Sequence, residues 1–254
     1  LLVRNCTSVL PARFRGVRAD TGGKVEGLYL CDELSGSESR RCRVLLKMRR
    51  HKPGAIISLD DHAGGDSGVR LVLEARADMP PAGDTAPDPT GDAGWIVRVE
   101  SKAGNSCAQT SDWLSRVGLT PLPPYILAAR KKHAIDIAEQ VDRAAYQTVF
   151  AGEPSDAAAR PEHGSVAAPT AGLHFTPELL RRIADRGVHT ADVVLHVGLG
   201  TFKPVETEFV EQHPMHTEWC MVPPVAAREI RRTKASRGRV IAVGTTAART
   251  LESF

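Results

Sequence analysis

The spacing of apolar residues changes near residue 117, and this change constrains the fold of the 254-residue chain more than any other feature. Upstream, apolar and polar residues alternate, so that Val69, Leu71, Leu73 and Ala75 are expected on one face of a strand. Residues 95–99 (W-I-V-R-V) alternate in the same way. Short alternating strands separated by Gly and Pro predict a small antiparallel sheet or barrel.

From Leu119 onward, helical and strand patterns take turns, which indicates a mixed α/β layer. Thr176-Pro177-Glu178 has the hydroxyl, proline and acid that favour a helix start. The expected elements are a helix over 178–186 closed by Gly187, strands over 191–197, 215–222 and 240–243, a helix over 224–237, and a last helix from near Ala247.

Two stretches place a histidine beside glycines and a threonine: 167–177 (A-A-P-T-A-G-L-H-F-T-P) and 195–204 (L-H-V-G-L-G-T-F-K-P). The helix between them adds only on the order of 15 Å at 1.5 Å per residue. We therefore expect His196 and the turn over 198–200 to share one cleft with the loop that carries Gly172 and His174. On strand 215–222, His216, Glu218 and Cys220 share a face.

Several glycine-rich turns have more than one interpretation. Gly198-Leu199-Gly200 after a strand is either a tight turn or a place where a cofactor approaches the backbone. Pro204 follows too soon for a dinucleotide-binding helix. Gly244-Thr245-Thr246 is either an ordinary helix start or an anion cradle with free N–H groups.

Composition excludes some function classes. The chain is 42% hydrophobic and 25% charged, which is typical of a globular protein with a real core. No run approaches the roughly 18 apolar residues of a membrane span, and no signal peptide is recognisable. The five cysteines form no C-x-x-C pair, so we expect a reducing cytoplasm and no disulfide framework.

The sequence has weaker signals for metal and nucleic-acid sites. His213 and His216 resemble zinc-ligand spacing, but on a strand they face opposite sides, so no metal is expected. The net charge of +3 is compatible with a polyanionic partner without predicting one. The basic clusters 49–52 (R-R-H-K) and 130–133 (R-K-K-H), like the stripe of Arg228, Arg231 and Arg232, are either solvated faces or nucleic-acid contacts.

Seven stretches, taken together, resemble one family. They are L-P-A-R at 10–13, L-P-P-Y-I at 122–126, Y-Q-T-V-F at 146–150, A-P-T-A-G-L-H-F at 168–175, H-V-G-L-G-T-F-K-P-V at 196–205, M-H-T-E at 215–218 and V-G-T-T at 243–246. Their order and spacing resemble those of the S-adenosylmethionine:tRNA ribosyltransferase-isomerases of queuosine biosynthesis. The resemblance covers nearly the whole chain.

The resemblance implies both a fold and a reaction. The fold is a larger mixed α/β domain with a small inserted β-barrel domain: 1–14 begin the large domain, 15–117 form the barrel, and 118–254 resume the large domain. The reaction transfers and isomerises the ribosyl moiety of S-adenosylmethionine onto 7-aminomethyl-7-deazaguanine at the tRNA wobble position. Epoxyqueuosine forms, and adenine and methionine leave. S-adenosylmethionine is then a co-substrate, tRNA the partner, and the protein an expected monomer.

The chemistry is matched to residues as a hypothesis. A sulfonium acidifies the adjacent 5′-carbon, so the reaction needs a base there and an acid for the leaving adenine. His174, His196 and His216 are the candidates, unranked, and Glu218 would orient His216 or handle the amine proton. The expected co-substrate-binding residues are Thr170, Gly172, Gly198, Gly200, Thr201, Thr245 and Thr246.

The sequence departs from the family pattern in two ways. The pattern has an arginine after Asn-x-Thr, where this chain has Ser8, so a charge-assisted contact to a carboxylate or phosphate is missing. The chain starts without methionine and stops at Phe254, so we expect missing sequence at both ends. A tRNA-binding homologue without catalysis and a metal-dependent hydrolase using His213, His216 and Glu218 remain as alternative functions.

Overall fold

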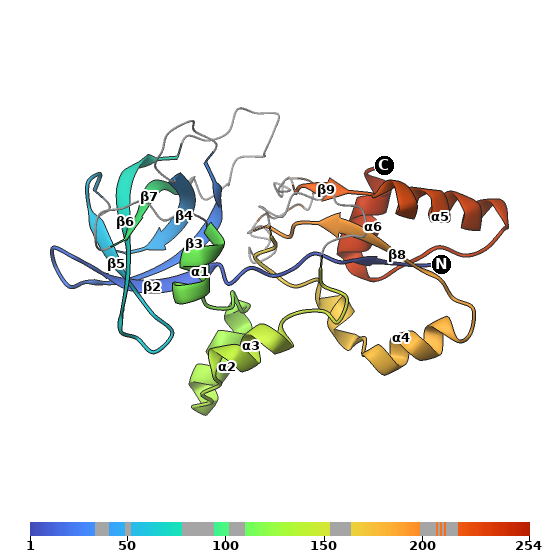
Figure 1. The fold of residues 1–254 in the computed structure, drawn as a ribbon, viewed down its shortest axis with the longest axis horizontal. Coiled ribbons are helices and arrows are strands. Elements are labelled where there is room, and N and C mark those ends of the chain that lie inside the picture. Colours follow the sequence, from blue (N-terminus) through green and yellow to red (C-terminus); the bar gives the residue numbers. More distant parts are fainter. Residues whose placement is uncertain are drawn as a thin grey trace.

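The computed structural model describes residues 1–33, 41–48, 52–77, 94–101, 110–152, 164–198, 207, 209, 211 and 218–254. A β-barrel lies at one end of the long axis and an α/β sheet at the other (Figure 1). The barrel closes in the order β2-β3-β4-β7-β6-β5. Its strands are β2 (Arg13–Arg18), β3 (Lys24–Asp32), β4 (Arg41–Lys47), β5 (Ile56–Asp60), β6 (Asp66–Arg76) and β7 (Trp95–Ser101). The prediction of an α/β protein with a small β-barrel is confirmed.

The alternating pattern explains the barrel interior. Val69, Leu71 and Leu73 of β6 are buried, and so are the alternate residues of the neighbouring strand β7. The expectation for Ala75 was wrong, because that residue is exposed. The pairing register of β6 with β7 shifts between Leu73 and Ala75. Such a β-bulge interrupts the regular alternation of the strand, and Ala77, two residues further on, is buried again.

Helix α1 (Thr110–Val117) packs against the barrel core. The ring of Trp113 meets those of Phe14 and Tyr29 edge to face, with centroids 6.1 Å and 5.9 Å away. Such pairs contribute about 0.5–1.5 kcal/mol each beyond the burial of their area. Trp113 thus fixes α1 to the barrel.

The second sheet has the strand order β10-β1-β8-β9. Its strands are β1 (Leu2–Asn5), β8 (Thr190–Leu195), β9 (Cys220–Met221) and β10 (Ile241–Ala242). β1 pairs in parallel with both β8 and β10, whereas β9 is antiparallel to β8. The buried Asn5 amide joins the ends of β1 and β8, since it accepts from the Leu195 N–H and donates to the Leu195 carbonyl, both at 3.0 Å.

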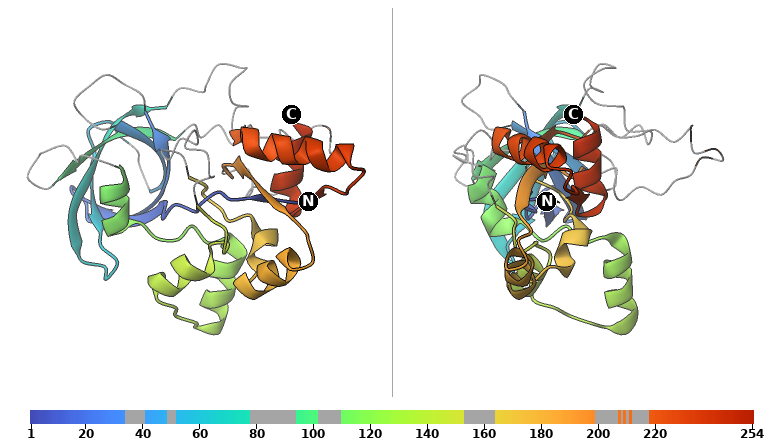
Figure 2. Two further views of the ribbon diagram at one scale, coloured as in Figure 1. Left: turned by 45° about the vertical axis from the view of Figure 1, so that its right-hand side comes forward. Right: turned by 90° about the vertical axis from the view of Figure 1, so that its right-hand side faces the viewer.

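Helices flank this sheet on both faces (Figure 2). Helices α5 (Pro224–Ala235) and α6 (Gly244–Glu252) cover one face, where Ala226 and Ala247 pack against Ala191 and Val193. Helix α4 (Pro177–Ala184) lies over the opposite face, preceded by the short 3-10 helix η1 (Thr170–His174). The remaining helices, α2 (Pro124–His133) and α3 (Glu139–Ala145), lie between barrel and sheet in Figure 1.

The expected helix starts are only partly correct. Thr176 caps α4, because its hydroxyl accepts from the Leu179 N–H at 3.2 Å. The last helix begins at Gly244 rather than near Ala247, since Gly244 provides a φ of +78° at the sharp turn from β10. Helices α4 and α5 end two residues earlier than predicted. Every helix in the described ranges is too short or too polar to cross a lipid bilayer.

Candidate functional site

The Glu218 carboxylate forms hydrogen bonds with two separate segments of the chain. Its Oε1 accepts from the Gly198 N–H at 2.9 Å, just beyond the end of β8. Its Oε2 accepts from Nη1 of Arg249 on α6 at 2.5 Å. The Glu218 side chain is only 8% exposed, and the Arg249 side chain is 39% exposed. Both carboxylate oxygens are therefore engaged, and they fix the turn after β8 relative to α6.

His196 directly follows β8, two residues before Gly198. Its ring stacks on Trp219, with centroids 4.9 Å apart and planes inclined by 18°. Its backbone N–H donates to the Trp219 carbonyl at 2.9 Å. On the ring, Nδ1 lies 3.1 Å from Oγ1 of Thr7, a buried residue just after β1. Two segments, those of Thr7 and Trp219, thus hold His196.

The loop that carries Gly172 packs against the protein itself. A Cβ added at Gly172 would lie 2.7 Å from Thr148 Cγ2 and 2.8 Å from Phe150 Cζ. The Gly172 N–H already donates to the Pro169 carbonyl at 2.8 Å. Glycine is needed here for close packing, which the sequence alone did not distinguish from approach by a ligand.

η1 also contacts the start of α6. A Cβ added at Gly244 would lie 2.7 Å from Cβ of Ala171 in the middle of η1. No side chain caps α6 at Val243, and Thr245 is exposed beside the half-buried Thr246. Because Arg249 of the same helix binds Glu218, α6 connects η1 with the turn at Gly198.

His174 differs from His196 in its surroundings. It is exposed, like Thr170, and its Nδ1 lies 3.3 Å from the Ala171 carbonyl oxygen. The shared cleft of His174 and His196 stays a prediction. By contrast, among the described residues the nearest atoms to a Cβ added at Gly198 are those of Glu218 at 3.9 Å.

Three of the expected site residues, His216, Gly200 and Thr201, lie outside the described residues, as do His213 and the cluster 49–51. Within the described ranges, no three His, Cys, Asp or Glu side chains are grouped so as to hold a metal ion. Cys6, beside Thr7, is no candidate nucleophile, because burial raises the pKa of its thiol to about 11.

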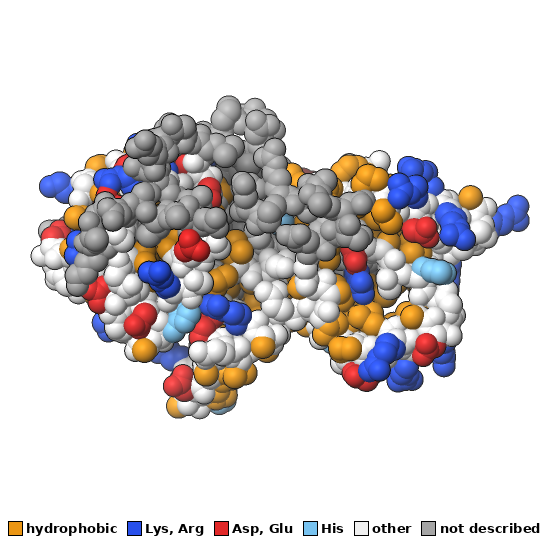
Figure 3. Space-filling model, viewed as in Figure 1, with side chains coloured by type: hydrophobic (Ala, Val, Ile, Leu, Met, Phe, Trp, Pro, Cys, Tyr) orange, Lys and Arg blue, Asp and Glu red, His pale blue; other side chains and the backbone are white. Residues whose placement is uncertain are grey.

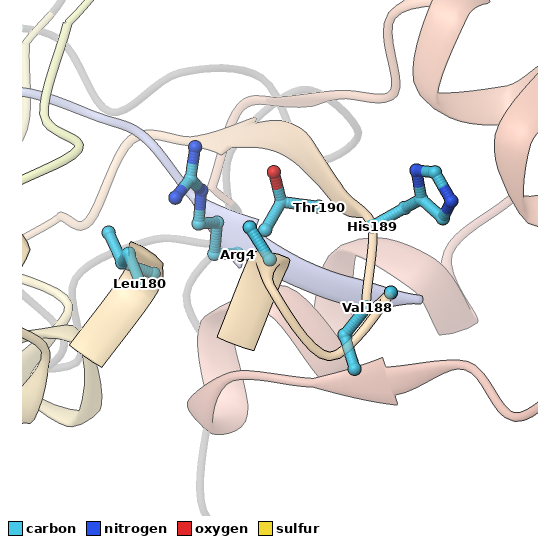
Figure 4. A pocket seen from close by; sticks show the side chains of 7 residues that line it. Arg4, Leu180, Val188, His189 and Thr190 are labelled. Carbon is cyan, nitrogen blue, oxygen red and sulfur yellow. The ribbon is translucent and has the colours of Figure 1, made fainter. Parts of the chain in front are cut away.

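A surface hollow of about 430 Å³ lies elsewhere, at the start of β8 (Figure 4). Arg4, His189 and Thr190 line it together with Leu180 of α4. Asp192 binds Nε of Arg4 at 2.6 Å, and the guanidinium carbon lies 4.7 Å from the Phe150 ring centroid. The stacked histidine and the glycine turn are at the other end of the strand.

Sequence reasoning missed three residues that shape the site: Arg249, Thr7 and Ser165. Arg249 is four residues after Thr245 and therefore on a similar face of α6, and a buried carboxylate such as Glu218 requires a cation or donors. Thr7 belongs to the Asn-x-Thr stretch already recognised. Ser165 has no such signal, because its role depends on a contact over 158 residues.

Known proteins resemble the chain over its whole length. An S-adenosylmethionine:tRNA ribosyltransferase-isomerase from Geobacter metallireducens is 41% identical over 99% of this chain and 61% of its own length. One of the same name from Gloeobacter violaceus is 42% identical over all of this chain and 59% of its own length. The chain thus spans about three fifths of these relatives.

One solved structure is also similar in sequence. The crystal structure of an S-adenosylmethionine tRNA ribosyltransferase from Thermotoga maritima is 22% identical, with a TM-score of 0.28, over 99% of this chain and 54% of the other.

The family described as queuosine biosynthesis protein matches residues 1–254. The chain therefore belongs to the queuosine biosynthesis protein family.

Proposed function

We propose that this chain belongs to an enzyme that transfers and isomerises the ribosyl moiety of S-adenosylmethionine. The acceptor is 7-aminomethyl-7-deazaguanine in tRNA, the product is epoxyqueuosine, and adenine and methionine are released. The proposal extends the names of the relatives to this chain, which is about 40% identical to them. The cytoplasm, where tRNA is modified, is the expected location.

The observation that carries the proposal is the meeting of separate family motifs at α6. Gly198 belongs to one motif, Glu218 to another, and α6 begins with a third. The hydrogen bonds of Glu218 with Gly198 and Arg249 join them, and Ala171 of η1 packs against Gly244. Packing of the sheet alone does not require these motifs to lie together.

The reaction requires proton transfers that histidines can perform. A base removes a proton from the 5′-carbon beside the sulfonium, and an acid protonates the departing adenine. His174, His196 and His216 are the proposed acid and base residues. Glu218 is proposed to orient His216 or to accept the proton of the attacking amine, and its two hydrogen bonds support a fixed orientation.

The co-substrate is proposed to lie across η1, the turn after β8 and the start of α6. Thr170 and Thr245 are exposed, and Thr246 is half-buried, so their hydroxyls are available to ribose hydroxyls. The N-terminus of α6 favours the methionine carboxylate, because unpaired N–H groups and the helix dipole attract anions. Gly198, Gly200 and Thr201 complete the proposed binding set, with Gly172 providing the close packing underneath.

The tRNA is proposed to contact basic helices. Arg228, Arg231, Arg232 and Lys234 are exposed on α5, where Figure 3 shows blue side chains gathered. On α2, Arg130 is bound at 2.6 Å and 2.5 Å by Asp142, which leaves Lys131, Lys132 and His133 exposed to solvent. The single acid on α5, Glu229, does not balance its four cations.

The decisive experiment measures adenine release from S-adenosylmethionine in the presence of tRNA that carries the modified base. Release that depends on the modified base supports the proposed reaction. Binding of that tRNA without release indicates a tRNA-binding homologue, whereas release of other products together with a stoichiometric metal indicates the hydrolase.

A further inference from the structure

Three buried groups form a chain of hydrogen bonds that ends on His196. The Val197 N–H donates to Oγ of Ser165 at 2.9 Å. Oγ of Ser165 lies 2.8 Å from Oγ1 of Thr7, which lies 3.1 Å from Nδ1 of His196. Ser165 and Thr7 are 0% and 3% exposed, so water does not compete for these hydroxyls.

The direction of the hydroxyl hydrogens follows from counting donors. A hydroxyl has one hydrogen and can accept two. Ser165 Oγ already accepts from Val197, and within the described part of the chain Thr7 Oγ1 is the one acceptor in reach of its hydrogen. A buried hydroxyl left without an acceptor costs about 1–3 kcal/mol. Ser165 therefore donates to Thr7.

Thr7 must then donate onward. Its hydroxyl oxygen accepts from Ser165, and its own hydrogen has Nδ1 of His196 as the acceptor in reach. An imidazole nitrogen that accepts a hydrogen bond carries no proton, and in the neutral ring the proton then resides on the other nitrogen. The arrangement selects one tautomer of His196.

We infer that Thr7 and Ser165 are positioning residues that hold His196 as the neutral tautomer with its proton on Nε2. If the proposed function holds, His196 serves the reaction as a hydrogen-bond donor towards a developing negative charge or a departing nitrogen, and not as the base at the 5′-carbon. His174 and His216 then remain as the candidates for that base. Asn5 supports the relay, because its Oδ1 accepts from the Thr7 N–H at 3.2 Å.

The backbone around the relay keeps its geometry fixed. The Ser165 N–H donates to the Ser8 carbonyl at 2.9 Å, and the Leu10 N–H donates to the Ser165 carbonyl at 3.0 Å. The Val166 N–H donates to the Val197 carbonyl at 2.9 Å. The segments that carry Thr7, Ser165 and His196 are therefore bound to one another independently of the three side chains.

The tautomer can be measured directly by NMR on the ligand-free chain labelled with ¹⁵N-histidine, at about pH 8, above the ordinary histidine pKa of ~6.5. The signal of His196 is assigned by its absence in His196→Gln. We expect Nδ1 without a proton and Nε2 with one. A proton on Nδ1 in the wild-type chain overturns the inference.

Variants test the direction of the relay. Thr7→Val removes the donor to Nδ1 and should lose the wild-type tautomer, whereas Thr7→Ser should keep it. Ser165→Ala should also keep it, because among the described residues the Thr7 hydrogen then has Nδ1 as its one acceptor in reach. Ser115→Ala, on the exposed face of α1, is the control without effect. An unchanged tautomer in folded Thr7→Val refutes the positioning role of Thr7, and a shift to Nδ1–H in folded Ser165→Ala refutes the assigned direction of the Thr7 hydrogen bond.

The release assay separates this inference from the proposed function. Because glutamine keeps an N–H donor, His196→Gln is expected to retain more adenine release than His196→Ala. Equal loss in both variants contradicts the donor role. A wild-type chain with the expected tautomer and no adenine release contradicts the proposed function alone.

Discussion

Arg249 and Glu218 form an ion pair across 31 residues of sequence, with Nη1 2.5 Å from Oε2. Arg249→Met keeps the length of the side chain and removes the charge. We expect a loss of about 1–3 kcal/mol, the cost of leaving a buried polar group without its partner, because Glu218 is 8% exposed and loses its cation. Chemical denaturation measures the change in unfolding free energy.

The control for this variant is Arg232→Met. Its guanidinium is 80% exposed and 3.9 Å from Glu229, so the pair is screened by solvent. The two variants should therefore differ clearly in stability. Equal unfolding free energies of the two variants would mean that the ion pair of Arg249 with Glu218 does not stabilise the fold.

His174→Ala should leave the fold nearly intact, because His174 is exposed and its ring has one weak contact at 3.3 Å to a neighbouring carbonyl. Loss of an acid–base residue typically reduces turnover about 100-fold or more. Adenine release and the thermal midpoint are the measurements. A folded variant with nearly normal turnover would assign His174 a structural role.

Two glycines of the proposed binding set, Gly172 and Gly198, should respond differently to alanine. Gly172→Ala places Cβ 2.7 Å from Thr148, so we expect a destabilisation of about 1–3 kcal/mol, typical of overpacking. Gly198→Ala has 3.9 Å of room and should be nearly neutral for stability. We expect Gly198→Ala to weaken binding of S-adenosylmethionine, measured by calorimetry. Unweakened binding in that variant would exclude close approach of the co-substrate at the turn.

Ser8→Arg should strengthen ligand binding. Ser8 is exposed and its side chain occupies the position where the family pattern has an arginine, next to Thr7. A hydrogen bond to a charged group contributes about 1.5–3 kcal/mol, which corresponds to at least a tenfold lower Kd for S-adenosylmethionine or for tRNA. Ser8→Met controls for side-chain length, and equal affinities of the two variants would contradict the expectation.

Binding of tRNA should weaken steeply with salt, because each neutralised phosphate releases counterions. Replacing Arg228, Arg231 and Arg232 by alanine should reduce the log–log slope by about one unit for each phosphate that is no longer neutralised. Arg181→Ala on α4 is the control, since that cation is already paired with Glu178 at 2.9 Å. A slope that is the same in wild type and triple variant would identify α5 as a solvated face.

Local patterns in the sequence predicted the local elements. The alternation of apolar residues correctly predicted which faces of β6 and β7 are interior, up to the bulge after Leu73. The hydroxyl and proline of Thr176-Pro177 correctly predicted the start of α4. The bulge depends on pairing between strands, so alternation within one strand does not indicate it. The central position of the four-residue strand β1 in its sheet was likewise not predictable. Its two neighbouring strands, β8 and β10, begin at Thr190 and Ile241, far along the chain.

The same limit applies to the candidate site. His196, Gly198 and Glu218 were selected from motifs, and the structure joins the last two directly. Ser165 and Arg249 were not selected, since the partner that gives each of them its role is not a neighbour in the sequence. Their importance comes from partners 158 and 31 residues away. The distinction between a glycine for packing, as at Gly172, and one with open space, as at Gly198, also needs coordinates.

The position of β1 sets an order in which the chain can assemble during synthesis. The barrel strands are contiguous from Arg13 to Ser101, so their pairings can form as soon as that stretch has left the ribosome. Leu2, by contrast, pairs with Thr190 and Ile241. Contacts of such high sequence separation form slowly, and β1 must wait until β8 and β10 have been synthesised. We expect a nascent chain to hold a folded barrel while β1 is still unpaired, which makes β1 a site where chaperones can bind.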